Sequence, residues 1–105
     1  MRKEQIRVLR KKPGEGWRWI LVDNTLEALQ KEVGGYIETV TIPGQEGIVF
    51  ICNEEGRLMG LPENGFADFV GTILAATSDD DEFDSLGFYQ AEGLRRLTLL
   101  MGGGE

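Results

Sequence analysis

The side chains best placed to do chemistry in this sequence are polar groups in two neighbouring turns. The first turn covers residues 53–56, the second covers residues 61–64, and a short strand is expected between them at 57–59. Turns this close in the chain are expected to lie close in space, where their amides and carboxylates could hydrogen-bond a small ligand. Turn chemistry explains their glycine and proline equally well, but explains the paired glutamates less well. The candidate binding residues are Asn53, Glu54, Glu55, Arg57, Glu63 and Asn64.

Catalysis is disfavoured by the residue types that the sequence lacks. It contains no histidine, which removes Ser-His-Asp and Cys-His catalysis and nearly every zinc site. The single cysteine, Cys52, lies in an apolar run with no base beside it, so a nucleophilic role is not expected. The only carboxylate groupings suited to acid–base work, Glu54–Glu55 and Glu63–Asp68, have no nucleophile or metal to act with. We therefore expect no enzyme, no catalytic residue and no cofactor.

The acidic run at 78–84 invites a calcium-site interpretation that its spacing does not support. An EF-hand loop needs glycine at its sixth position and glutamate at its twelfth. Counting from Asp79 places Asp84 and Gln90 there instead. We expect a solvated surface loop and no metal site.

Two tryptophans form a further candidate contact surface. Trp17 and Trp19 fall on one face of an expected strand, because strand side chains alternate between faces. They could stack on bases or form a flat contact surface. Alternatively, they pave the sheet beneath a helix, and the period-two pattern favours this interpretation.

The charge of the chain is segregated along the sequence. The whole chain has a formal charge of −7, of which residues 1–12 contribute +5, and this leaves −12 for the rest. Because this acidic part of the chain repels nucleic acid, direct nucleic-acid binding is not expected. It would be drawn to basic protein surfaces, including those that hold nucleic acid. A purely solubilising role for the acidic surface remains an open alternative.

The amino-terminal half predicts a hairpin followed by a helix. Strand-like segments on either side of a Pro-Gly turn predict a β-hairpin over residues 4–23. A helix is expected next, capped by Asn24 with Glu27 reaching back to it. Gly34 is expected to end this helix, because glycine adopts the left-handed closing conformation most readily.

The rest of the chain predicts further strands and a second helix. Residues 36–42 and 48–52 are rich in β-branched, aromatic and other apolar residues, as in strands. Residues 66–76 fit both helix and strand, and we favour a turn followed by a strand that begins near residue 70. An apolar stripe predicts a carboxy-terminal helix at about 88–101, ended by the glycine run that follows it.

These elements predict a single α+β domain over residues 1–105. A chain of this length is too short for two independent cores. We expect a mostly antiparallel sheet of about five strands with two helices packed on one face. The expected parts are the basic hairpin at 4–23, a central α/β region at 24–77, the acidic loop at 78–84 and the helix at about 88–101.

Composition also favours a cytoplasmic setting. No apolar stretch is long enough for a membrane span, and the amino terminus has no hydrophobic segment like that of a signal peptide. One cysteine cannot form an internal disulfide, which favours a reducing compartment. We therefore expect no membrane association.

Three stretches between Leu26 and Leu74 carry a resemblance. They are LEALQKEVGGYIETV from Leu26, NEEGRLMGLPEN from Asn53 and GTI from Gly71. Together they resemble the domain-of-unknown-function family three-eight-four-six, whose members are small proteins of bacteria, phages and mobile elements. The resemblance implies a shared fold unit and a phage-like setting, and it implies no catalytic residue.

Two functions are consistent with these observations. The first is a non-catalytic interaction protein of phage or mobile-element type that works in the host cytoplasm. Its acidic surface would occupy, and so inhibit, a basic site on a host defence or nucleic-acid-processing protein. The alternative is a small-ligand or nucleotide-signal binder that uses the turns at Asn53 and Asn64, with aromatic stacking from Trp17, Trp19 or Tyr36. A homodimer, formed through an edge strand or the terminal helix, is also open.

Overall fold

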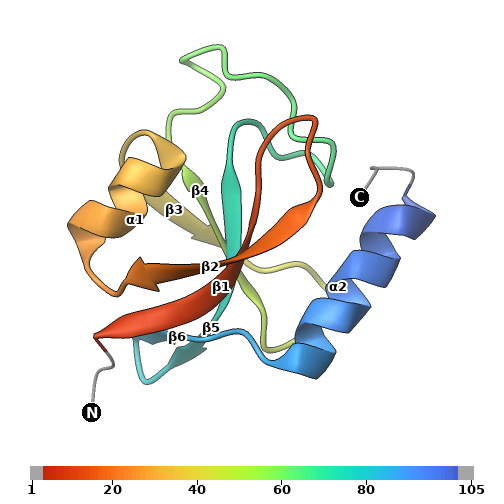
Figure 1. Cartoon of the computed structure of the whole chain (residues 1–105). Helices are drawn as coiled ribbons and strands as arrows, with labels where there is room; N and C mark the ends of the chain where they lie inside the picture. The colour runs from red at the N-terminus through yellow and green to blue at the C-terminus, as the bar shows by residue number, and fades with distance from the viewer. Residues whose placement is uncertain (1–3, 102–105) are drawn as a thin grey trace.

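The computed structural model describes residues 4–101, which form an α+β fold (Figure 1). An antiparallel sheet with the strand order β2-β1-β5-β4-β3, to which β6 adds by pairing with β5, carries two helices. The predicted class, with about five strands and two helices, is confirmed. The elements are β1 (Gln5–Lys11), β2 (Trp17–Asp23), α1 (Leu26–Val33), β3 (Ile37–Val40), β4 (Val49–Asn53), β5 (Ile73–Asp79), β6 (Glu82–Asp84) and α2 (Phe88–Leu100).

The late strand β5 lies at the centre of the sheet, beside the amino-terminal hairpin. β1 and β2 pair along their whole length, from Gln5 opposite Asp23 to Lys11 opposite Trp17. β5 then inserts between β1 and β4, antiparallel to both. This arrangement gives β5 neighbours on both sides, and its first four residues are buried. Such a central strand needs apolar residues on both faces, as its sequence Ile-Leu-Ala-Ala provides.

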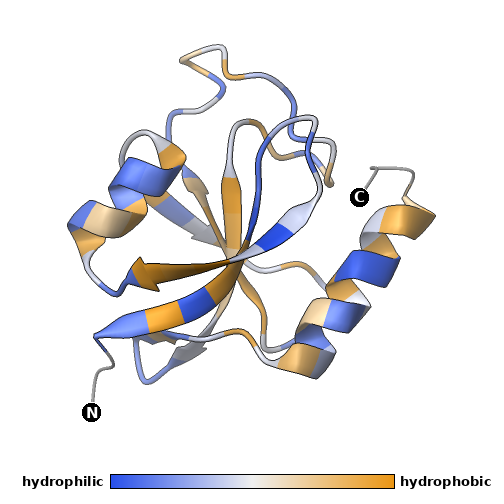
Figure 2. Cartoon of the chain, viewed as in Figure 1, coloured by the Kyte–Doolittle hydropathy of each residue, from blue (hydrophilic) through white to orange (hydrophobic). Residues whose placement is uncertain are grey.

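The two helices lie on opposite faces of the sheet, so the prediction that both pack on one face is wrong. Leu29 and Val33 of α1 belong to a core cluster with Leu74 of β5, whereas Leu94 of α2 belongs to a second cluster with Ile73. Successive residues of a strand point to opposite faces, so each cluster lies on its own side. Figure 1 shows the helices on either side of the sheet, and Figure 2 shows the hydrophobic central strands between them.

Thr25 caps helix α1, and not Asn24 as the sequence predicted. The Thr25 hydroxyl accepts a hydrogen bond from the Ala28 backbone N–H at 3.1 Å. The Asn24 side chain is instead buried and donates to the Phe83 carbonyl of β6 at 3.1 Å. Gly34 ends the helix in the left-handed conformation, with φ at 82°, as expected.

The segment after β4 makes consecutive turns where a strand was expected at 57–59. Backbone hydrogen bonds run from Met59 to Glu55, from Gly60 to Arg57 and from Leu61 to Gly56. These local bonds leave no extended stretch for a neighbouring strand to pair with. Gly60 has a positive φ of 70° within these turns.

Two further segments differ in detail from the prediction. A turn near residues 66–69 precedes β5, as favoured, although the strand begins at Ile73. The acidic segment 78–84 is a hairpin and not an irregular loop, because β5 continues to Asp79 and pairs with β6. Asp80 and Asp81 both have positive φ, as a two-residue turn of type I′ requires. Helix α2 covers the predicted range, but the glycines expected to end it lie outside the described residues.

Candidate functional site

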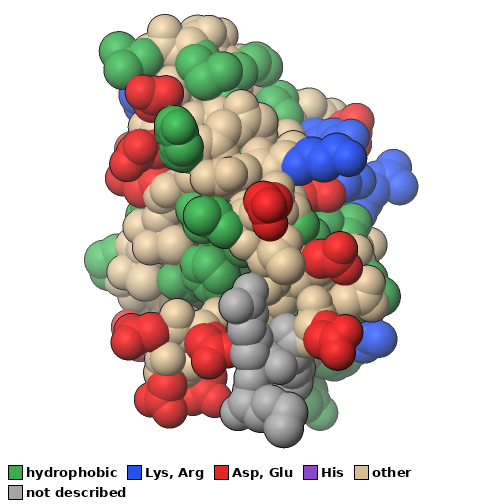
Figure 3. Space-filling model, turned by 90° about the vertical axis from the view of Figure 1, so that its left-hand side faces the viewer, with side chains coloured by type: hydrophobic (Ala, Val, Ile, Leu, Met, Phe, Trp, Pro, Cys, Tyr) green, Lys and Arg blue, Asp and Glu red, His purple; other side chains and the backbone are tan. Residues whose placement is uncertain are grey.

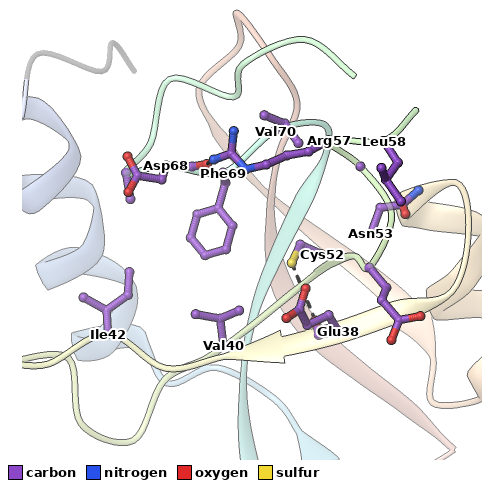
Figure 4. A pocket seen from close by; sticks show the side chains of 13 residues that line it. Glu38, Val40, Ile42, Cys52, Asn53, Arg57, Leu58, Asp68, Phe69 and Val70 are labelled. Carbon is purple, nitrogen blue, oxygen red and sulfur yellow. Dashed lines mark hydrogen bonds between the residues drawn. The ribbon is translucent and has the colours of Figure 1, made fainter. Parts of the chain in front are cut away.

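The best-formed pocket of the described chain lies beside the edge strand β3 (Figure 4). It has a volume of about 390 Å³ and is open to solvent. This volume lies within the range of small-ligand sites, roughly 300–1,000 Å³. The lining comes from Glu38, Val40 and Ile42 on and after β3, Cys52 and Asn53 of β4, the turn at 54–58 and the loop at 67–70.

The floor of this pocket is apolar because it is an extension of the core under α2. Glu38 and Val40 are two residues apart on β3, so both side chains lie on the same face of the sheet. Val40, Ile42 and Phe69 all pack against the buried cluster on that face. The Phe69 ring lies 5.6 Å from the Phe50 ring, centroid to centroid. The aromatic loop residue therefore closes one wall of the pocket while it completes the core.

Charged groups stand around this apolar floor. Glu38, Glu54, Asp68 and Arg57 are all exposed and line the pocket. The Arg57 guanidinium donates a hydrogen bond to the Asp68 backbone carbonyl and so bridges the two chain segments that form the rim. In Figure 4 this bridge spans the top of the pocket, and Glu38 lies across from it. The rim therefore carries three carboxylates and one guanidinium.

Asn53 lines the pocket, but the fold already uses its amide. Its Nδ2 donates to the Val33 carbonyl at 3.2 Å, and its Oδ1 accepts from the Glu55 backbone N–H at 2.8 Å. The first bond ties the end of α1 to β4. Gly35 packs so closely here that a Cβ would lie 2.8 Å from the Asn53 Nδ2. Asn53 is thus a structural residue that also lines the pocket.

Cys52 lies at the base of the pocket as a neutral thiol. Its side chain is buried, and its Sγ donates to the Glu38 carbonyl at 3.7 Å. Burial, followed by the negative charge of Glu38, raises the pKa of the thiol above its ordinary value. Because the thiolate is the nucleophilic form, this environment suppresses reactivity.

The remaining turn residues lie outside this pocket. Glu55 and Glu63 are exposed and do not line it. Asn64 is buried, and its Nδ2 donates to the carbonyls of Lys11 and Gly71, at 2.9 and 2.8 Å. Of the six turn residues selected from the sequence, the structure therefore brings together Asn53, Glu54 and Arg57.

The two tryptophans share a face but have different environments. Trp17 is buried beneath α2, and its Nε1 donates to the Thr98 hydroxyl at 2.8 Å. Its ring meets the Phe66 ring edge-on, with the ring centroids 5.5 Å apart. Trp17 therefore packs on the sheet beneath a helix, the interpretation that the period-two pattern favoured. Trp19 is 37% exposed and lines a separate surface depression with Arg7 and Phe88. The pair therefore does not form one accessible stacking platform.

Several site features escaped the sequence analysis. The sequence predicted a strand at Val40 and Ile42 and a turn near Phe69, and it offered Asp68 only as part of a carboxylate pair with Glu63. The proline after Ile42 was a usable indication, because prolines near strands favour sheet edges, where pockets can open. Lys11 contributes to the +5 charge of residues 1–12, but its side chain is only 1% exposed.

Carboxylates predominate among the exposed charged side chains of the described residues. None of the Asp and Glu side chains of residues 4–101 is buried, whereas Lys11 is lost to the interior. Arg10 and Glu32 form a half-buried ion pair at 3.0 Å. Figure 3 shows the face with α1, where acidic side chains are widely spread and Lys and Arg gather mainly at one side.

Across residues 4–101, no group of three or more His, Cys, Asp or Glu side chains is arranged to hold a metal ion. Neither α1 nor α2 has the length and apolar character that a membrane crossing requires.

Comparison with known proteins gives a match to a family model. Neither the curated proteins nor the solved structures contain a match to this chain. The family model described as "Domain of unknown function (DUF3846)" matches residues 6–98, which include all the motifs noted in the sequence.

Proposed function

The chain belongs to the DUF3846 family, and we propose that it is a non-catalytic interaction protein whose acidic surface binds a basic surface on a partner protein. The observation that carries this proposal is the imbalance of exposed charge. The Asp and Glu side chains of the described residues all reach solvent, while Lys11 is withdrawn into the core. The outward-facing charge is therefore even more negative than the composition suggests.

Surface carboxylates act on a partner collectively. A single exposed ion pair contributes only about 0–1 kcal/mol, so affinity requires several pairs together. An excess of one sign of charge also steers association and disfavours partners of like charge, including nucleic acid. A basic protein surface is the complementary partner, and a nucleic-acid-binding site is one such surface.

We further propose a phage-type or mobile-element setting for this binding. The resemblance noted in the sequence is to small proteins of bacteria, phages and mobile elements. In that setting the partner is a host protein in the cytoplasm, such as a defence or nucleic-acid-processing enzyme, and occupation of its basic site inhibits it.

The test is to identify the partner and measure the salt dependence of binding. The immobilised protein captures candidates from host lysate, and each purified candidate is titrated in low and high salt. We expect the affinity to fall steeply with salt, because exposed charges are screened beyond about a Debye length, roughly 10 Å at 0.1 M. An affinity that is the same in low and high salt, or the absence of any basic partner, contradicts the proposal. Light scattering of the purified protein checks for self-association through the edge strands β2 and β3.

A second candidate function, small-ligand binding, is favoured by the pocket beside β3. The carboxylates of Glu38, Glu54 and Asp68 outnumber Arg57 there, which disfavours the phosphates of a nucleotide. A thermal-shift screen with nucleotides, neutral metabolites and organic cations tests this function. A ligand at a hundredfold excess over its Kd adds about 2.7 kcal/mol to stability, and unchanged melting curves would retire it.

A further inference from the structure

We propose that the pocket beside β3 receives a lysine or arginine side chain from the basic partner. This inference rests on the proposed function and specifies where one cation of the partner is bound. The pocket combines a hydrophobic floor with an acidic rim, and a lysine or arginine combines an aliphatic stem with a cationic head in the same way.

The floor matches the stem. Val40, Ile42 and Phe69 present apolar surface that is continuous with the core. The side chains of Val40 and Phe69 point toward each other across the pocket in Figure 4. Contact with this surface removes the methylene groups of the stem from water, which favours binding.

The rim matches the head. The three carboxylates of Glu38, Glu54 and Asp68 outnumber the single guanidinium of Arg57. The hydrogen bond from Arg57 to the Asp68 backbone carbonyl holds this guanidinium at the rim. The charge of Glu38 acts inside the pocket as well, because it contributes to the raised pKa of Cys52 at the base. An anionic group would meet net repulsion here, whereas a cation would be attracted.

Exposed apolar residues beside the pocket point to a protein as the source of the cation. Leu58 lies on the rim and is 88% exposed, and the adjacent Met59 is 54% exposed. A free cation within the pocket leaves most of this surface in water. A protein surface whose lysine or arginine occupies the pocket lies against the turn at 54–60 and covers both side chains.

The experiment compares two double variants that change the net charge equally. The probe is a fluorescein-labelled peptide of alternating arginine and serine, and fluorescence anisotropy in low salt gives its Kd. The pocket variant is Glu38→Gln with Glu54→Gln, and the control is Glu15→Gln with Glu27→Gln, which are exposed and lie outside the pocket. We expect the pocket variant to weaken binding about fivefold or more and the control less than twofold, as local rather than diffuse charge pairing predicts.

Two further measurements keep the inference open to refutation. Thermal melting verifies that all variants fold, which we expect because the substituted carboxylates are exposed. In NMR titrations the peptide should shift the methyl resonances of Val40 and Ile42, whereas methyl groups under α1 should stay in place. Unshifted Val40 and Ile42 resonances in the presence of bound peptide would overturn the pocket assignment.

The outcomes separate this inference from the proposed function. Equal weakening by both double variants overturns the pocket assignment and leaves the acidic-surface function standing. Failure of the wild-type protein to bind the peptide in low salt counts against the proposed function itself. If free N-acetylarginine amide binds as tightly as the peptide, the site takes a small cation and the assignment to a partner protein is wrong.

Discussion

Lys11 and Asn64 each donate a side-chain hydrogen bond to the backbone carbonyl of the other, across 53 positions of the chain. The Lys11 Nζ lies 2.7 Å from the Asn64 oxygen, and the Asn64 Nδ2 lies 2.9 Å from the Lys11 oxygen. Both side chains are buried. This reciprocal pair fastens the end of β1 to the loop that carries Phe66 and Phe69, and thereby helps position one wall of the candidate pocket.

Asn64→Ala should destabilise the protein by about 2–4 kcal/mol. It leaves the buried carbonyls of Lys11 and Gly71 without the Asn64 Nδ2, which donates to both, and each unsatisfied buried group costs about 1–3 kcal/mol. The Asn64 Oδ1 is buried without a hydrogen-bond partner in the described structure, so its removal offsets part of this loss. Chemical denaturation measures the change. The neighbouring exposed residue provides the control, since Glu63→Gln should stay within about 0.5 kcal/mol of wild type.

Stability should depend on pH through Lys11. Burial lowers the pKa of Lys11 in the native state from its ordinary value of 10.5. Between the lowered pKa and 10.5 the unfolded chain binds more protons than the native state, so the free energy of unfolding rises with pH. Lys11→Met should abolish this rise. A persistent rise in the variant would assign the effect to another group.

The comparison must be made without Cys52, which acts in the opposite direction. The pKa of Cys52 is raised from its ordinary value of 9.0 by burial and by Glu38. Its native state therefore keeps a proton that the unfolded state loses, and stability falls as pH rises through this range. Denaturation curves of Cys52→Ala, with and without Lys11→Met, isolate the contribution of the lysine.

The reactivity of Cys52 should depend on Glu38. In the native protein we expect slow alkylation by iodoacetamide, because the thiol is buried and its pKa is raised. Glu38→Gln removes a negative charge that disfavours the thiolate and should increase the rate several-fold at pH 8. In denaturant the two proteins should react equally fast. A rate that the substitution leaves unchanged would show that burial alone protects the thiol.

Two glycines with similar backbone angles should differ in their tolerance of alanine. Gly14 (φ 76°) has no neighbour within 4 Å of an added Cβ, whereas at Gly71 (φ 73°) the Cβ would lie 2.7 Å from the Leu61 Cδ1. Gly14→Ala should cost about 1 kcal/mol for the positive φ. Gly71→Ala should cost about 1–3 kcal/mol more, because Leu61 must move. Equal costs in denaturation would show that Leu61 moves aside freely.

Local patterns predicted most of the secondary structure. The hairpin of β1 and β2 and the helix α2 follow from short-range alternation and helical spacing, which depend little on distant contacts. The apolar run at 48–52 also predicted a strand, and β4 occupies nearly that range with four of its five residues buried. The cap of α1 was misplaced by one residue because Asn24 and Thr25 are both good capping types, and a distant contact with Phe83 decided between them.

The pocket was predictable only in part, because long-range contacts build it. Asn53, Glu54 and Arg57 were selected from turn composition alone, and they lie together because they are neighbours in the chain. The loop at 67–70 reaches the same place through the anchor between Lys11 and Asn64. Lysine is rarely buried, so nothing local to Lys11 indicated its position.

The two tryptophans should report separately on the interior and the surface. Trp17 is 5% exposed and Trp19 is 37% exposed. Trp19→Phe, which leaves Trp17, should emit at shorter wavelength and resist acrylamide quenching, whereas Trp17→Phe should emit at longer wavelength and be quenched readily. Trp17→Phe should also cost about 1–3 kcal/mol, because the hydrogen bond to the Thr98 hydroxyl is lost.

The same variants test the base-stacking hypothesis directly. Stacking on both rings would require Trp17 to leave its contacts with Phe66 and Thr98 beneath α2. We therefore expect added guanosine monophosphate to leave the emission of Trp17 unchanged in the Trp19→Phe variant. Circular dichroism, which does not depend on tryptophan emission, verifies that each variant is folded. Saturable quenching of Trp17 by the nucleotide would mean that α2 moves away from the sheet, and would favour nucleotide binding over occupation of a basic protein surface.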